Sequence, residues 1–172
     1  WERRTVRYRF VTPKKTLAMV IQSDSRTDWV IEPLLKERGD IDIIGRYATA
    51  PLCDTGEVNR QAQEAGRNGI IRGHIPCFDV FGQPGCWQDA CCLAGTSNMI
   101  YASYDDPQWV HAFLAILRDR KLVWIRSLKG ARYDLIELGG GSASSTVISP
   151  SIFEEFVSPY DSALIAAAHA VH

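Results

Sequence analysis

The sequence lacks the features that mark membrane, secreted or nucleic-acid-binding proteins. No apolar run in its 172 residues reaches the roughly 18–20 residues that a membrane-spanning helix needs, and residues 1–4 lack the apolar core of a signal peptide. The 19 basic and 20 acidic residues nearly balance, so a net charge of −1 creates no global field toward nucleic acid or an anionic membrane. We therefore expect a cytoplasmic protein that binds neither nucleic acid nor membrane.

The cysteine content does not fit a disulfide framework. The five cysteines are an odd number and include the adjacent pair Cys91 and Cys92, whereas disulfide-rich secreted domains usually contain an even number. We expect reduced, buried thiols. The sequence also lacks an internal repeat and an initial methionine, and His172 follows an apolar, alanine-rich stretch, so we expect both ends to lie inside a longer protein.

What the sequence does contain is the composition of a globular domain. Hydrophobic residues make up 46% of it and charged residues 23%, which is ordinary for a chain that buries a core. Its length fits one domain of about 100–200 residues, or part of a larger one. We treat residues 1–172 as a single domain, with a hairpin and its lead-in over residues 1–35 and β/α units over residues 36–172.

Alternating residues predict an antiparallel β-hairpin at the amino terminus. Residues 5–11 place Val6, Tyr8 and Phe10 on one face of a strand, and residues 16–22 form a second strand after a short turn. The first 15 residues contain six basic residues and one acidic residue. This basic face is either an anion-binding surface or a solvated face that protects the edge of the sheet.

Helix and strand patterns alternate after the hairpin, in the order of a β/α protein. Asp106 and Pro107 are a typical N-cap and first helical residue, and the apolar spacing behind them predicts an amphipathic helix to about Lys129. The other predicted elements are a polar helix over residues 56–69 and strands over residues 70–75 and 133–138.

The carboxyl-terminal stretch predicts a further helix with an interruption. Ser149 and Pro150 open it, and Ser151 with Glu154 has the spacing of a capping box. Pro159 lacks a backbone N–H, so we expect the helix to restart or kink at Ser158 and Pro159.

The passage from Glu137 into the small residues 139–145 is a candidate ligand site. In α/β folds an acidic residue at the carboxyl end of a strand often lines the ligand crevice, and three consecutive glycines allow the backbone to approach a substrate closely. The segment lacks the spaced glycines of a dinucleotide fingerprint. The alternative is a flexible linker between strand and helix.

Residues 73–92 concentrate His74 and four of the five cysteines, which are residue types that bind zinc. The spacing is unfavourable, because eight residues separate Cys77 from Cys86 and no second close pair faces His74 and Cys77. We therefore predict no metal site within this sequence. A nucleophilic pair of Cys77 with His74 stays open, whereas His111 and His169 are not candidates, because a lone helical histidine is more often packed or solvated.

Four stretches share motifs with one superfamily. They are the hairpin followed by Asp28-Trp-Val-Ile-Glu-Pro33, the segment Gly82-Gln-Pro-Gly-Cys-Trp87 through Gly95, the helix start Tyr104-Asp-Asp-Pro-Gln-Trp-Val110, and residues 133–160 with their SP..F.EF..PY pattern. On these residues the chain resembles the uroporphyrinogen decarboxylase superfamily. The resemblance implies an α/β fold that is a partial (β/α)8 TIM barrel, preceded by the hairpin. A complete barrel needs about 250 residues, so the chain would be its amino-terminal half.

The differences from the family pattern favour one branch of it. The decarboxylase of haem synthesis has an Arg-Gln-Ala-Gly-Arg segment that holds the substrate carboxylates, and here residues 61–67 are only distantly similar. The tyrosine that follows its tryptophan is replaced at the corresponding position by Cys92. The hairpin and the Glu-Pro passage instead resemble the branch of methyl-corrinoid methyltransferases and O-demethylases.

The resemblance therefore implies a zinc-dependent enzyme that moves a methyl group to or from a corrinoid on a partner protein. The zinc ligands of the family would fall beyond His172. We expect a partner that completes the barrel, or a companion chain, and a homo-oligomer. The alternatives are a tetrapyrrole decarboxylase and a truncated, non-catalytic binding module. The predicted site consists of Glu137 as catalytic residue and of substrate-binding residues His74, Phe78, Gly140, Ser142 and Ser145.

Overall fold

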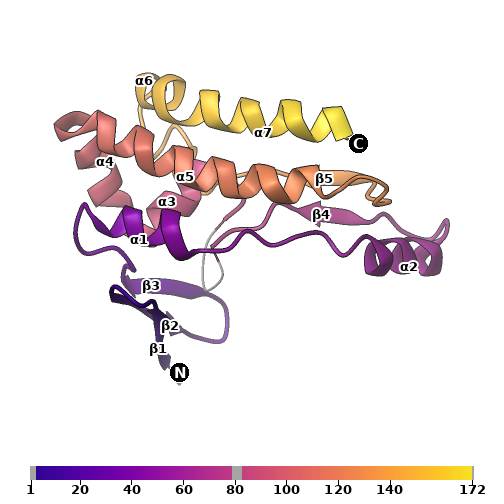
Figure 1. The fold of residues 1–172 in the computed structure, drawn as a ribbon, viewed down its shortest axis with the longest axis horizontal. Coiled ribbons are helices and arrows are strands. Elements are labelled where there is room, and N and C mark those ends of the chain that lie inside the picture. Colours follow the sequence, from indigo (N-terminus) through magenta and orange to yellow (C-terminus); the bar gives the residue numbers. More distant parts are fainter. Residues whose placement is uncertain (1–2, 79–82, 172) are drawn as a thin grey trace.

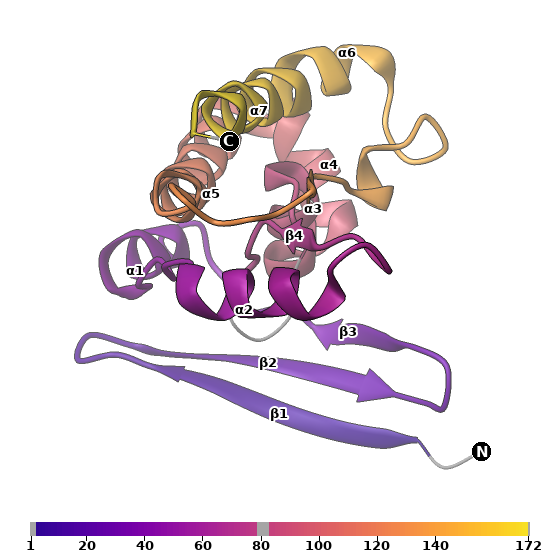
Figure 2. The same cartoon turned by 90° about the vertical axis from the view of Figure 1, so that its right-hand side faces the viewer.

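The computed structural model describes residues 3–78 and 83–171. It is a mixed α/β structure in which an antiparallel sheet lies on one side of a group of helices, as Figures 1 and 2 show. A short pair of parallel strands lies beside the helices, toward the end of the molecule opposite α4 (Figure 1). The α/β class predicted from the sequence is confirmed.

The amino-terminal sheet contains the predicted hairpin and one further strand. Strands β1 (Arg4–Val11) and β2 (Thr16–Ser23) pair antiparallel from Arg4 opposite Ser23 to Val11 opposite Thr16, which confirms the hairpin. Strand β3 (Asp28–Glu32) pairs with the other edge of β2. Because β2 is central and faces the helices, its residues 19–21 are buried.

Ion pairs tie the basic hairpin to neighbouring elements. In the β1–β2 turn, the Nζ atom of Lys15 lies 2.6 Å from Oδ1 of Asp40, which is the first residue of α1 (Asp40–Tyr47). Asp40 is buried, and its other oxygen accepts the backbone N–H groups of Lys36 and Glu37. Arg7 on β1 pairs with Glu32 on β3. Part of the basic face is therefore neutralised within the structure.

The longest helix confirms its predicted cap and length. Helix α5 (Pro107–Arg126) begins after Asp106, whose side chain accepts the backbone N–H of Trp109 at 3.1 Å. It ends just before Gly130, which has a φ of +85° and so favours glycine. The neighbouring helices are α2 (Thr55–Ala65), α3 (Cys86–Ala94) and α4 (Thr96–Asp105). Helix α3 lies in the centre of the core, with all of its residues except Gln88 buried.

The carboxyl-terminal helix differs from its prediction at one point. Ser149 is the N-cap of α6 (Pro150–Ile152), because its hydroxyl accepts the N–H of Ile152 at 3.3 Å. The predicted capping box from Ser151 to Glu154 is therefore wrong, since helix formation starts two residues earlier, at the proline. A wide π-helical turn, η2 (Phe153–Val157), follows, and α7 (Ser158–Val171) starts anew at Ser158 as expected.

The parallel strands are shorter than predicted and join distant parts of the chain. Strand β4 (Arg72–His74) pairs with β5 (Leu135–Glu137), and helices α3, α4 and α5 form the connection between them. Asp134 fixes the start of the pair, because its carboxylate accepts the N–H of Ile71 at 2.7 Å. Over residues 3–78 and 83–171 the strands form these two sheets and no closed barrel.

Among the described residues, none of the helices combines the length and the apolar character that crossing a bilayer requires.

Candidate functional site

The carboxyl ends of β4 and β5 bring two predicted site residues together. His74 and Glu137 are partners in the parallel register, and the N–H of Ile75 donates to the carbonyl of Glu137 at 3.4 Å. Because side chains alternate along a strand, His74 and Glu137 lie on one face of the pair, while Gly73 and Ile136 lie on the other. The structure thus joins residues that are 63 positions apart in the sequence.

An arginine on the same face holds the Glu137 carboxylate. The Nη1 atom of Arg72 lies 3.2 Å from Oε2 of Glu137, and both side chains are partly exposed. An ion pair of this exposure contributes only about 0–1 kcal/mol to stability. Its effect is to orient the carboxylate beside His74 at the strand ends, where a bound molecule could contact it.

The glycine-rich loop after β5 is held against the buried helix α3. The carbonyl of Gly139 accepts the N–H of Gly85 at 3.0 Å. The N–H of Ser142 donates to the side chain of Gln88, and the indole N–H of Trp87 donates to the carbonyl of Ser142 at 3.2 Å. These bonds order the loop, so it is not a freely flexible linker.

Gly140 has a packing function within this loop. A Cβ atom built at Gly140 would lie 2.7 Å from Cβ of Gln88, which is far inside van der Waals contact. The φ of −177° at Gly140 is open to any residue, so the requirement for glycine comes from space alone. The close approach that this glycine permits is therefore to α3.

Substitution at Gly140 is expected to loosen the loop. Gly140→Ala should lower the free energy of unfolding by about 1–3 kcal/mol, because the added methyl group forces the loop away from Gln88. Urea denaturation measures this loss. Gly139→Ala is the matched control, since nothing lies within 4 Å of a Cβ at that position; equal stability of the two variants would contradict this packing.

The other predicted site residues lie in different places. Phe78 is 1% exposed and packs edge-on against Phe10, with ring centroids 5.5 Å apart. Ser142 lines a small cavity between β3 and α3, and Ser145 lines a groove beside Phe153. The structure therefore pairs His74 with Glu137. Phe78 lies in the core instead, and Ser142 and Ser145 line two other cavities.

A buried ion pair that sequence reasoning missed supports the segment after β4. Lys121 of α5 and Asp89 of α3 have side chains that are 1% exposed, and their charged atoms lie 2.7 Å apart. Nζ of Lys121 also donates to the carbonyls of Pro76 at 3.0 Å and Gln83 at 3.3 Å. Asp89 accepts the backbone N–H of Phe78 at 3.3 Å. Burial raises the pKa of Asp89, and the Lys121 ammonium group opposes that rise.

The adjacent residue Arg120 binds the same segment from a second direction. Its Nη1 donates to the carbonyl of Cys77 at 3.0 Å and its Nε to the carbonyl of Thr49 at 2.8 Å. The sequence contained an indication of both interactions. Arg120 and Lys121 fall in register with Leu117 and Trp124 on the buried face of α5, where a basic residue requires a partner.

The thiols are free, and Cys86, Cys91 and Cys92 are buried as predicted, whereas Cys53 and Cys77 are only partly buried. Burial raises the pKa of Cys86 and Cys91 to about 12 and that of Cys92 to about 11. The pKa of Cys77 is also raised, chiefly by burial. Since the thiolate is the reactive and metal-binding form, these environments do not favour the Cys77 and His74 nucleophile pair.

No group of three potential metal ligands occurs among the residues that the structure describes. The potential donors nearby are mainly thiols whose pKa is raised by burial, which does not fit a closed zinc site.

A groove beside β5 adjoins the strand ends. It has a volume of about 550 Å³ and lies between the free side of β5 and helix α7. Its walls are largely apolar and include Ile75, Leu135 and Leu138 on the strand side and Leu164 and Ile165 on α7. The groove is thus an unfilled apolar surface next to Glu137.

Comparison of the chain with protein-family models, curated proteins and solved structures finds no match.

Proposed function

We propose that this chain forms the amino-terminal half of a (β/α)8-barrel enzyme of the uroporphyrinogen decarboxylase superfamily, in the methyltransferase and O-demethylase branch. The observation that carries the proposal is the placement of His74 and Glu137 together at the carboxyl ends of two parallel strands. In (β/α)8 enzymes the catalytic residues lie at this end of the strands. The choice of branch rests on the resemblance of the hairpin and the Glu-Pro passage to that branch.

The arrangement around β5 supports the barrel part of the proposal. Helices α5 and α7 run side by side, as helices on the outside of a barrel do (Figure 1). The groove between β5 and α7 borders the edge of β5 at which a following parallel strand would pair. A strand there would cover Leu135 and Ile136, since barrel strands are buried on both faces.

Zinc and a corrinoid would come from outside these residues. The described side chains do not fit a zinc site, so we propose that the zinc ligands lie beyond His172 and that the corrinoid is bound by a partner protein. When bound, zinc would supply an activated thiolate. The enzyme would act in the cytoplasm, where thiols such as those of this chain stay reduced.

In the proposed enzyme, Glu137 positions the substrate through its carboxylate. Arg72 orients this group by an ion pair at 3.2 Å, and His74 stands beside it as a second polar contact. A carboxylate can accept a hydrogen bond or a proton from a bound molecule at these strand ends. The apolar groove next to it would exclude water from one side of that molecule.

Replacing Glu137 tests the proposal. In the protein that contains this chain, Glu137→Gln is expected to lower kcat/KM by at least tenfold, or about 1.4 kcal/mol in transition-state stabilisation, because the amide keeps the size but loses the charge. Methyl transfer from methylcobalamin to a thiol, followed by absorbance, measures this rate.

Arg72→Gln removes the group that orients this carboxylate and leaves the carboxylate in place, so it should lower kcat/KM less than Glu137→Gln does. Both variants should unfold within about 1 kcal/mol of the unchanged protein. A rate unaffected by Glu137→Gln would place this residue outside the chemistry. Turnover of uroporphyrinogen without methyl transfer would favour the decarboxylase alternative. Binding of methylcobalamin or uroporphyrinogen without turnover of either would favour the non-catalytic module.

A further inference from the structure

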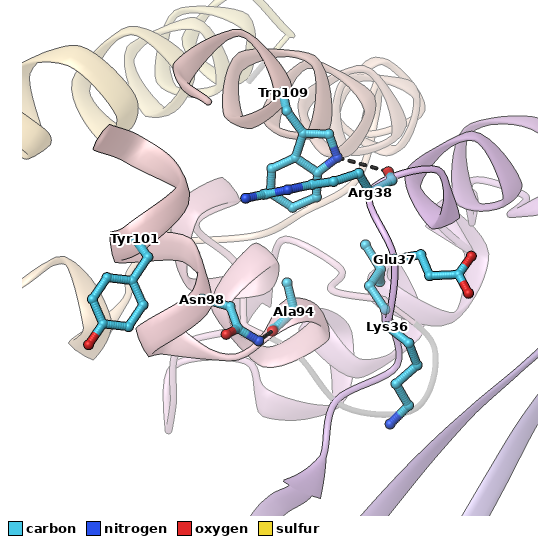
Figure 3. A pocket seen from close by; sticks show the side chains of 8 residues that line it. Lys36, Glu37, Arg38, Ala94, Asn98, Tyr101 and Trp109 are labelled. Carbon is cyan, nitrogen blue, oxygen red and sulfur yellow. Dashed lines mark hydrogen bonds between the residues drawn. The ribbon is translucent and has the colours of Figure 1, made fainter. Parts of the chain in front are cut away.

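A second pocket lies beside α4, toward the end of the molecule opposite β4 and β5 (Figure 1). It has a volume of about 510 Å³ and lies between the segment before α1 and the helices α3, α4 and α5. Arg38, Asn98, Tyr101 and Trp109 contribute side chains to its lining (Figure 3). None of these residues belongs to the proposed function above.

Arg38 lies over a tryptophan ring at this pocket. Its guanidinium carbon lies 4.2 Å from the centroid of the Trp109 ring, and the indole N–H of Trp109 donates to the backbone carbonyl of Arg38 at 2.8 Å. Figure 3 shows the guanidinium group lying across the Trp109 ring. Contact with the ring restricts the Arg38 side chain before any ligand arrives, so less entropy is lost on binding.

The charge of Arg38 is not compensated by a neighbouring carboxylate. Within the described parts of the chain, the ion pairs of this region join Glu37 to Lys15 and Lys36 to Glu32, and none involves Arg38. Figure 3 shows the Glu37 carboxylate directed away from Arg38. Lys36 also lines the pocket, but its Nζ lies 3.8 Å from Glu32, and Figure 3 shows it directed away from Arg38. Arg38 is therefore the planar cation that the pocket presents, and its fork of N–H donors matches a single carboxylate group.

The remaining walls suit a flat apolar body. Leu35, Ala94 and the Tyr101 ring supply apolar and aromatic surface, and the volume lies within the range of small-molecule sites, about 300–1,000 Å³. Asn98 donates its amide N–H to the carbonyl of Ala94 at 2.8 Å, which leaves its amide oxygen as an acceptor. A carboxylate alone would fill only a small part of this space.

We propose that this pocket binds an aromatic carboxylate, with the carboxylate on the guanidinium edge of Arg38 and the ring against the apolar wall. The site is independent of the strand ends that carry the proposed function. Phosphate fits less well, because the second cation of the lining, Lys36, is paired with Glu32 and phosphate has no apolar body to cover the remaining walls.

The indole N–H of Trp109 reports on the pocket in a ¹⁵N NMR spectrum, and its resonance is assigned by its loss in Trp109→Phe. Sodium benzoate is expected to shift this resonance saturably, whereas benzamide, its neutral analogue, and inorganic phosphate shift it at least tenfold less at equal concentration. Arg38→Gln should weaken benzoate binding at least tenfold. The backbone carbonyl that anchors Trp109 remains in that variant.

Arg46→Gln is the matched control, since Arg46 also lies over an aromatic ring, that of Tyr47 at 5.5 Å, but outside this pocket. It should bind benzoate as the unchanged chain does. Equal shifts with benzamide, or unchanged binding in Arg38→Gln, would overturn the proposal. Equal binding of phosphate would overturn it as well and would indicate a general anion site.

Discussion

The chain with Lys121→Met is expected to lose about 3–5 kcal/mol of unfolding free energy, the largest effect of any single substitution considered. The substitution leaves the Asp89 carboxylate, 1% exposed, without the cation that lies 2.7 Å from it. An isolated buried charge is far costlier than an absent ion pair. The carbonyls of Pro76 and Gln83 lose a donor at the same time. Urea denaturation followed by tryptophan fluorescence measures the loss.

A second substitution separates the effect of the unpaired Asp89 charge from the effect of the lost Lys121 packing. Adding Asp89→Asn to Lys121→Met removes the uncompensated carboxylate and should recover part of the lost stability. Lys129→Met is the matched control, because Lys129 is exposed just after α5 and should change stability by less than about 0.5 kcal/mol. A loss of under 1 kcal/mol for Lys121→Met would show that the pair is not buried as described.

Association through the edge of β5 is the second large effect that we expect. This prediction depends on the proposed half barrel. β5 pairs with β4 along one side, and the groove on its other side exposes apolar surface of β5 and α7. Unpaired strand edges and apolar patches favour association. We expect a homo-oligomer at micromolar concentration that buries well over 1,000 Å², and light scattering measures its mass.

A charge in the groove tests where the contact lies. Ile165 on α7 is 45% exposed and lines the groove, so Ile165→Lys should weaken association at least 100-fold, or about 2.8 kcal/mol. Val123→Lys is the control, because Val123 is 39% exposed on α5 and does not line the groove. A compact monomer of the unchanged chain that unfolds cooperatively would contradict the half-barrel proposal.

The sequence alone determined the elements whose causes are local. Asp106, Pro107 and Gly130 set the limits of α5 to within a few residues, because a cap bonds groups only three residues away. Alternation predicted the strands β1 and β2. The hydrophobic pattern and the short turn between the strands together set their register. Pro159 located the restart of the last helix, because it cannot donate a backbone hydrogen bond.

The tertiary structure decided the elements that depend on distant partners. Strand β3 has no clear alternation, with the burial of its five residues varying irregularly, and forms because β2 offers a free edge. The sequence indicated a strand end at Glu137. That His74 and Arg72 stand beside it follows only from the parallel pairing of β4 with β5.

The glycine-rich loop and the buried charges show the same division. The sequence predicted that the glycines let the backbone approach a substrate, whereas the fold shows that the close neighbour of Gly140 is Gln88 on α3. Lys121 and Asp89 are 32 residues apart and form their pair only when α5 packs on α3. Helix propensities, helix caps and hydrophobic alternation act over a few residues, so they can be predicted from the local sequence. Packing between distant segments, which meet only on folding, determines which charges form a pair and where a neighbouring helix requires a glycine.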